Sequence, residues 1–389
     1  MKKSILTHII IIAAALLLGV ADLSAAALST TVTSLSVGYY HACASLSNGT
    51  AHCWGYNSNG QLGDNTTTDS PVPVTVQNIG RVLSIVAGYL HTCAAVADHS
   101  VKCWGSNAYA QLGDTTYTSH LLPGDVVGLT GPVASLALGY YHSCALLSKG
   151  FVECWGYDEY GPWPGSTEDY QTSAYRIPGL SGVAAISAGG YTTCALLHIG
   201  TVRCFGGNDD GQFGGGYTGE GTEIGQAFGV KGAIGVAIGY QYGACALLKA
   251  GGKVKCWGYN EYGVLGFGTE STYNLLPDYV LELSGATSVG TGYYNTCALL
   301  KTGQVKCWGY NGDGELGNNN LNVTSSRTPV SVYGLLNGGA QSLHVGAFTS
   351  CVIMKVNSEI KCWGYGYYGQ LGNGATSNSP VPVSVVGIL

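Results

Sequence analysis

The sequence predicts an all-β protein, and within that class a seven-bladed β-propeller with four-stranded blades. Three observations predict it: a repeat of about 51 residues, 61 glycines in 389 residues, and no long stretch with the apolar period of a helix. Abundant glycine without a collagen period indicates many tight turns. Repeats of this length that contain short strands are typical of propeller blades rather than of helical solenoids.

The first 26 residues differ from everything that follows. Lys2 and Lys3 precede an apolar run at residues 9–20, and small residues follow at 24–27. This order is typical of a secretory signal peptide, and the run is short for a membrane span. We therefore expect a signal peptide at 1–26 and a seven-repeat propeller at 27–389 with no membrane span. The mature protein is expected to be secreted, periplasmic or at the cell surface.

Each repeat contains the tripeptide Cys-Trp-Gly or a close variant. Its aromatic residues are Trp54, Trp104, Trp155, Phe205, Trp257, Trp308 and Trp363. In the second repeat, residues 82–88, 91–96 and 100–104 are expected to be strands, and the Pro-Val-Pro-Val segment at 71–74 of the first repeat is typical of an edge strand. The recurring Trp beside Gly is expected to pack between blades, because glycine allows close approach.

The C-terminal strand is expected to close the ring. Residues 380–383 repeat the Pro-Val-Pro-Val of residues 71–74, yet nothing before the first repeat supplies the corresponding strand. We therefore predict that the last strand completes the first blade and removes an open sheet edge.

The 14 cysteines form pairs within repeats. A three-residue turn at 47–49 places Cys43 opposite Cys53, and the two pairs with longer spacing have longer turns, at 249–252 and 355–358. Because the chain has a predicted signal peptide and an even number of cysteines, we expect disulfides. Zinc is the alternative, but four ligands would require two blades to converge. The predicted bonds are Cys43–Cys53, Cys93–Cys103, Cys144–Cys154, Cys194–Cys204, Cys245–Cys256, Cys297–Cys307 and Cys351–Cys362.

Residues 86–113, VAGYLHTCAAVADHSVKCWGSNAYAQLG, resemble a repeat of the regulator of chromosome condensation family, and all seven repeats match in part. The resemblance implies a seven-bladed propeller with four-stranded blades, and the cysteine pairs look like the secreted bacterial branch. Family members have varied protein partners: a small GTPase on chromatin for nuclear members and β-lactamases for some secreted bacterial ones. The export signal and acidic composition put the nuclear exchange-factor role in doubt here.

Composition and motifs argue against several classes of function. A net charge of −6 provides no basic excess for nucleic acid. No motif for a nucleophile, base and orienting residue is present, so we expect no enzyme activity and no cofactor. His41, His91 and His142 could ring a metal ion. Other residues take their place in the remaining repeats, so a structural role is favoured and no metal is expected.

The chain contains 27 tyrosines, more than the predicted fold requires. Five tyrosines follow the blade glycine and are expected on one face: Tyr39, Tyr89, Tyr140, Tyr240 and Tyr293. Tyrosine supplies large amphipathic area at low entropic cost, as binding surfaces require. The alternative is that these residues only cover the end of the core. The divergent loops at 157–169 and 207–224 either assist binding or reflect drift, and their acids would favour a basic partner.

We therefore predict a secreted or periplasmic module that binds a protein through one propeller face, with the partner's identity open. The alternative is a surface lectin or adhesin that binds carbohydrate.

Overall fold

The computed structural model describes residues 30–389 except 161–162, 220 and 241–242. The predicted signal peptide lies outside this range. In the described part, strands dominate and the single helical element is the short 3-10 turn η1 (Glu261–Gly263). None of the described helical segments has the length and apolarity needed to cross a membrane.

The strands form seven antiparallel sheets of four, each drawn from consecutive strands of one repeat. Blades one to three are β1 (Val32–Val37), β2 (His41–Leu46), β3 (Ala51–Gly55), β4 (Ser70–Thr75); β5 (Val82–Ala87), β6 (His91–Val96), β7 (Val101–Gly105), β8 (His120–Asp125); and β9 (Val133–Leu138), β10 (His142–Leu147), β11 (Val152–Tyr157), β12 (Tyr170–Arg176). Blades four and five are β13 (Val183–Gly189), β14 (Thr192–Leu197), β15 (Val202–Gly206), β16 (Gly221–Gln226); and β17 (Ala233–Ile238), β18 (Gly243–Leu248), β19 (Val254–Tyr259), β20 (Tyr273–Tyr279). Blades six and seven are β21 (Ala286–Thr291), β22 (Asn295–Leu300), β23 (Val305–Tyr310), β24 (Ser325–Ser331); and β25 (Ala340–Val345), β26 (Thr349–Met354), β27 (Ile360–Gly364), β28 (Ser379–Ser384).

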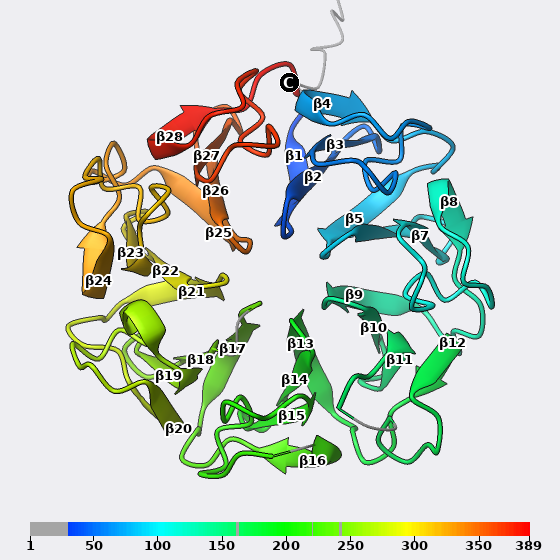
Figure 1. Ribbon diagram of the computed structural model, residues 1–389, viewed down its shortest axis with the longest axis horizontal. Coiled ribbons are helices and arrows are strands. Elements are labelled where there is room, and N and C mark those ends of the chain that lie inside the picture. Colours follow the sequence, from blue (N-terminus) through cyan, green and yellow to red (C-terminus); the bar gives the residue numbers. More distant parts are fainter. Residues whose placement is uncertain (1–29, 161–162, 220, 241–242) are drawn as a thin grey trace, which may run out of the picture. The chain divides into compact units, whose positions relative to one another are not determined.

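Residues Thr31–Leu389 form one compact unit in which the blades stand around a central axis (Figure 1). The first strand of each blade faces the axis and the fourth lies at the rim (Figure 1). The predicted seven-bladed propeller with four-stranded blades is therefore confirmed.

The hairpin between the second and third strands follows from its turn residues. In blade one the backbone N–H of Leu46 donates to the carbonyl of Thr50 at 2.9 Å, and Gly49 turns the chain with φ 90°. Glycine adopts this left-handed conformation without steric cost, whereas other residues are strained there. The turn fixes the register, in which Cys43 lies opposite Cys53.

A tryptophan fills each regular seam, which we define as the apolar interface between two neighbouring blades. At the seam between blades one and two, Trp104 packs with Leu62, and its indole Nε1 donates to the carbonyl of Gln61 at 2.9 Å. The equivalent Trp155 donates to the carbonyl of Gln111. These tryptophans are fully buried, so the prediction that they pack between blades is confirmed.

The seam between blades three and four reverses this arrangement. Blade four carries Phe205 in place of the tryptophan. The loop of blade three carries Trp163 at the position where five other loops carry leucine and the loop of blade four carries Phe213. The two rings lie in one buried cluster with centroids 6.4 Å apart. Trp163 donates its Nε1 hydrogen to the carbonyl of Asp169 in its own loop. The two divergent repeats thus compensate each other in volume.

The prediction that the C-terminal strand completes the first blade is wrong. Strand β28 pairs with β27 of the last blade, while β4 pairs with β3, with Cys53 opposite Val74. Each repeat begins with its axial strand and ends with its rim strand, so no blade lacks a strand. The ring closes through contacts between the last and first blades instead: Trp54 shares one apolar cluster with Leu371 and Val385, and the backbone N–H of Ala347 donates to the carbonyl of Gly38 at 3.1 Å.

Candidate partner-binding face

Backbone hydrogen bonds between blades hold the tyrosines that follow the blade glycines. The backbone N–H of Tyr39 donates to the carbonyl of Gly88 at 3.1 Å, and that of Tyr240 to the carbonyl of Gly292 at 3.0 Å. A Cβ atom on Gly38 would lie 2.4 Å from the carbonyl oxygen of Gly88, so the blades approach this closely only because glycine is present. The same backbone contact is made by Tyr140 and Tyr293, and it holds these four tyrosines near the central axis.

The five predicted tyrosines meet around that axis. The ring of Tyr39 lies 4.7 Å from Tyr89, 5.8 Å from Tyr140, 5.5 Å from Tyr240 and 5.8 Å from Tyr293, measured between centroids. Phe348 of the last blade joins them, 5.2 Å from Tyr39. We call these six residues the tyrosine hub. Most of these contacts are edge-to-face, an arrangement that aromatic rings favour.

The hub is half-buried rather than fully exposed. Tyr240 is 6% exposed and lines the central cavity beneath the hub, whereas the other four tyrosines keep part of their surface in solvent. Burial raises the pKa of Tyr39 and Tyr240 and raises the pKa of Tyr40 to about 12, with neighbouring tyrosines adding to the shift for Tyr39 and Tyr40. At neutral pH these hydroxyls stay protonated and uncharged.

Sequence reasoning missed a larger set of aromatic residues around the hub. A second tier contains Tyr40, Tyr141, Tyr191 and Tyr294, and loop tyrosines pack outside it. Tyr141, Tyr109, Tyr157 and Tyr170 form a column with successive centroid distances of 4.0, 5.5 and 4.6 Å. Two sequence signals mark these positions: Tyr repeated after the blade glycine, and Tyr directly after Trp-Gly. We call the hub together with these outer tyrosines the tyrosine face.

The axial strands line an open cavity of about 240 Å³ below the hub. Most of its lining residues have apolar side chains, and Ser36, Ser187 and Thr291 add hydroxyl groups. Ser36 accepts a hydrogen bond from the backbone N–H of Ala87, and Ser187 accepts one from that of Ile238. Two of these hydroxyls therefore tie neighbouring axial strands together.

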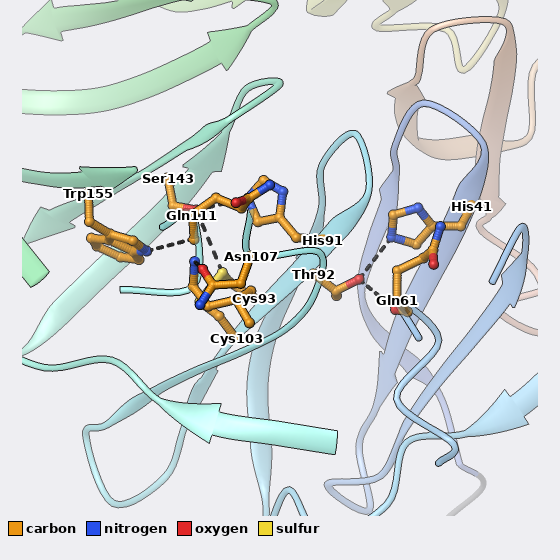
Figure 2. Close-up of a disulfide and its surroundings, with 11 residues drawn as sticks. His41, Gln61, His91, Thr92, Cys93, Cys103, Asn107, Gln111, Ser143 and Trp155 are labelled. Carbon is orange, nitrogen blue, oxygen red and sulfur yellow. Dashed lines mark hydrogen bonds between the residues drawn. A yellow bond between two sulfur atoms is a disulfide. The ribbon is translucent and has the colours of Figure 1, made fainter. Parts of the chain in front are cut away.

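The three candidate histidines bridge blades. His41 lies 2.8 Å from the hydroxyl of Thr92, which itself donates to the carbonyl of Gln61 at 2.8 Å (Figure 2). His91 makes the same contact with Ser143. Because the single hydroxyl proton goes to the carbonyl, the His41 Nε2–H must be the donor.

Burial lowers the pKa of His41 and His91 to about 3 and that of His142 to about 4. The imidazole rings are therefore neutral and form hydrogen bonds between neighbouring blades. Within the described ranges, no group of three or more His, Cys, Asp or Glu side chains has a metal-binding arrangement.

Seven disulfides join the second and third strands of the blades, between Cys43 and Cys53, Cys93 and Cys103, Cys144 and Cys154, Cys194 and Cys204, Cys245 and Cys256, Cys297 and Cys307, and Cys351 and Cys362. They are buried in the seam clusters, away from the tyrosine face. Figure 2 shows the bond between Cys93 and Cys103 beside the histidine bridges.

Charge is divided between the two ends of the propeller. The loops between the third and fourth strands lie at the tyrosine face because antiparallel strands alternate in direction, and these seven loops contain no Lys or Arg. Their described acids are Asp64, Asp69, Asp114, Asp158, Glu159, Glu168, Asp169, Asp209, Asp210, Glu261, Glu270, Asp313 and Glu315. The turns at the opposite end carry Arg81, Lys149, Lys231, Lys249, Lys253, Lys301 and Lys355. We call this end the basic end.

Comparisons with known proteins agree with the fold. Human HERC4, named as a probable E3 ubiquitin-protein ligase, is 28% identical over 258 residues, which are 66% of this chain and 19% of HERC4. A solved structure of Kap60 bound to yeast RCC1 (Prp20) matches with a TM-score of 0.77 at 20% identity, covering 92% of this chain and 84% of that one. The ectodomain of the Physcomitrella patens receptor kinase CR4 matches with a TM-score of 0.55 at 20% identity, covering 87% and 75% of the two chains. This chain thus spans about a fifth of the curated relative, and the solved structures show the shared fold alone.

Two family models together match more than half of the chain. Both describe the regulator of chromosome condensation (RCC1) repeat: one matches residues 48–95, 98–146, 251–299 and 362–388, and the other residues 32–61, 82–111, 133–161, 183–212 and 286–315. The matched segments recur in step with the blades and include Tyr39, Tyr89, Tyr140 and Tyr293 of the hub, while Tyr240 and Phe348 lie outside them. The chain belongs to the regulator of chromosome condensation (RCC1) repeat family.

Proposed function

We propose that this propeller is an exported, non-catalytic module that binds a protein partner through the tyrosine face. The observation that carries the proposal is the convergence of the hub tyrosines, all within 6 Å of Tyr39. Rigid aromatic anchors supply much of the binding energy in protein interfaces, and tyrosine adds a hydroxyl that can satisfy polar groups of the partner.

The rigidity of the face supports the same proposal. Four of the six hub residues, Tyr39, Tyr140, Tyr240 and Tyr293, are joined to neighbouring blades by backbone hydrogen bonds, and the seams below are filled by buried tryptophans. A partner would therefore meet a largely preformed surface and would bind without a large ordering cost. The similarity to yeast RCC1, solved bound to Kap60, supports a role in protein binding for the same fold.

Export is supported by two independent features. The first 26 residues have the pattern of a signal peptide, and seven disulfides lie in the seams. Disulfides persist in oxidising compartments such as the periplasm or the extracellular space.

The test is capture of a partner from an envelope extract with immobilised residues 27–389, followed by affinity measurements on the purified partner. We expect Tyr89→Ala and Tyr293→Ala each to weaken binding about tenfold or more, as loss of a central aromatic anchor does. Ile199→Ala and Val356→Ala are matched controls, because these side chains are 77% and 78% exposed in turns at the basic end. The controls should bind like the parent.

Two outcomes would overturn the proposal. Equal affinity for the parent and both tyrosine variants would exclude the hub as the contact surface. Glycan-array binding that the tyrosine variants abolish, with no protein captured, would instead favour the carbohydrate-binding alternative.

A further inference from the structure

A pocket at the rim of the tyrosine face has an unusual combination of groups. It has a volume of about 230 Å³ and is lined by Tyr259, Glu261, Tyr262, Glu270 and Arg327, among others. It lies where the loop that follows β19 in blade five approaches β24 of blade six (Figure 1). The volume is sufficient for the end of one long side chain.

Glu261 is surrounded by aromatic rings rather than by cations. The hydroxyl of Tyr259 donates to its carboxylate, and Tyr262, Tyr273 and Tyr294 are close enough for that carboxylate to raise the pKa of each of their hydroxyls, in addition to the effect of burial. None of the four ion pairs among the described residues involves Glu261. Its carboxylate therefore forms no ion pair with a cation of the described residues.

The one cation of the pocket is already engaged. Arg327 Nη1 lies 2.9 Å from Glu270 Oε1, and both side chains are largely exposed at the rim. Arg327 belongs to strand β24, and the loops between the third and fourth strands at this face contain no Lys or Arg. The electrostatic surroundings of Glu261 thus favour a positive charge brought by a ligand.

Backbone strain marks the same pocket. Tyr262 has φ 59°, a left-handed conformation that is uncommon for a large side chain, yet the residue is 38% exposed. The ring lies 5.1 Å from Tyr294 and 5.0 Å from Tyr310, edge to face in both cases. Strain of this kind persists where surrounding structure holds it and is concentrated at functional sites.

We propose that this pocket binds a lysine or arginine side chain of a cationic segment of the partner, which packs against the Tyr259 and Tyr262 rings and pairs with the Glu261 carboxylate. This inference rests on the proposed function and gives the partner's chemistry. Aromatic faces attract cations, and the attraction strengthens when the cation is partly desolvated. The surplus of acids on this face would also steer a basic partner toward it.

The test uses a fluorescein-labelled nine-residue peptide with three arginines separated by Gly-Ser spacers, and the same peptide with citrulline at the three positions. Citrulline keeps the planar shape of arginine but carries no charge. We expect the arginine peptide to bind residues 27–389 at low salt, about tenfold more tightly than the citrulline peptide, and to weaken as salt rises.

Two variants locate the contact. Glu261→Gln removes the charge but keeps the size of the side chain, and should weaken binding of the arginine peptide about tenfold. Tyr262→Gly removes the ring while relieving the strain, because glycine adopts a positive φ freely. It should weaken binding without lowering the melting temperature. Glu282→Gln, an exposed acid at the basic end, is the matched control and should bind like the parent.

Equal binding of the two peptides, no binding of either, or full affinity in Glu261→Gln would each overturn the inference. If Tyr89→Ala loses the captured partner while Glu261→Gln retains the arginine peptide in full, the proposed function stands and this inference fails. If Tyr89→Ala retains the partner while Glu261→Gln loses the peptide, the pocket stands and the wider binding face fails.

Discussion

The tryptophans and the tyrosines of this chain recur with the same period but occupy opposite environments. Trp104 is fully buried in a seam and donates a hydrogen bond to the preceding blade, whereas Tyr89 of the same blade lies half-exposed in the hub. One aromatic position in the repeat therefore holds blades together, and the other builds a shared surface at the axis.

The difference shows which residues of a repeat are tied to folding. Seam residues can change only in compensation with their neighbours, as Trp163 and Phe205 do. Face residues vary more freely. Leu90 takes the place of the second-tier tyrosine in blade two, and in blade seven Ala347 follows the blade glycine while the next residue, Phe348, enters the hub. Substitutions in the seams should therefore change stability, and substitutions on the face should change binding.

The largest effect on the seam side should come from reducing the disulfides. Each bond closes a short loop and should contribute about 2–3 kcal/mol, chiefly by restricting the unfolded chain. We expect a large fall in melting temperature after reduction, with peptide mapping under non-reducing conditions used to verify the seven bonds. An unchanged melting temperature in fully reduced protein would contradict a stabilising role, and bonds between different repeats would contradict the pairing.

Truncating a seam tryptophan should give the next largest effect. Trp104→Ala should lower the free energy of unfolding by about 3–5 kcal/mol, because it leaves a cavity between blades one and two. Trp104→Phe keeps most of the volume, loses the hydrogen bond to Gln61 and should cost less, about 1–2 kcal/mol. Urea titrations measure both values. A larger loss for Phe than for Ala would show that volume does not control the seam.

A smaller effect should come from removing one histidine bridge. His91→Thr should lower the free energy of unfolding by about 1 kcal/mol at neutral pH by breaking the contact with Ser143; Thr192 and Thr349 occupy the same position in other blades.

The same variant tests the pH dependence. Burial lowers the folded-state pKa of His91 to about 3. As pH falls from about 6.5 toward 3, His91 therefore becomes protonated in the unfolded chain but stays neutral in the folded chain, which favours unfolding. The parent should lose stability over that window, and His91→Thr should lose less. Parallel stability profiles from pH 7 to pH 4 would contradict a buried, neutral His91.

The smallest expected effect is an increase in stability, from the substitution Asp158→Asn. Asp158 takes the position of a buried asparagine in other blades, such as Asn57, and burial with the nearby Asp169 raises its pKa to about 7. The protonated Asp158 carboxyl group stabilises the folded state fully below the pKa that it has in the unfolded chain, and this stabilisation is lost as pH rises through about 7. Asp158→Asn should therefore be more stable than the parent at pH 8, by about 1 kcal/mol, and the difference should shrink toward pH 5. Melting curves at the two pH values measure it. A variant that is less stable at pH 8 would show that the carboxylate is required.

Much of the fold was predictable because the repeat places the same residues in the same environments. Glycine in the hairpin turns, the alternation of short strands and the tryptophan beside glycine each follow from local sequence and packing. The way in which the ring closes was not predictable, because it depends on whether a repeat begins with its axial strand or with its rim strand. The Pro-Val-Pro-Val segment at 71–74 could end the first blade or begin the second. The pairing of β4 with β3 shows that it ends the first blade.

The candidate face was predictable in outline only. The glycine before Tyr39 and Tyr89 marks positions near the axis, so convergence could be expected from the repeat. The contribution of Phe348 to the hub and the strain at Tyr262 could not be expected from the repeat, because both depend on contacts between blades rather than on the local sequence. The partnership of Trp163 with Phe205 likewise joins two repeats that each look irregular alone.

The most direct test measures binding and stability together in two variants of blade two, Tyr89→Ala and Trp104→Phe, against the partner captured by the parent. We expect Tyr89→Ala to weaken binding about tenfold or more while its melting temperature stays close to that of the parent. Trp104→Phe should lower the melting temperature and leave the affinity of the folded protein unchanged. Unchanged affinity in Tyr89→Ala together with a lowered melting temperature would contradict the account and leave the tyrosines as covers of the core.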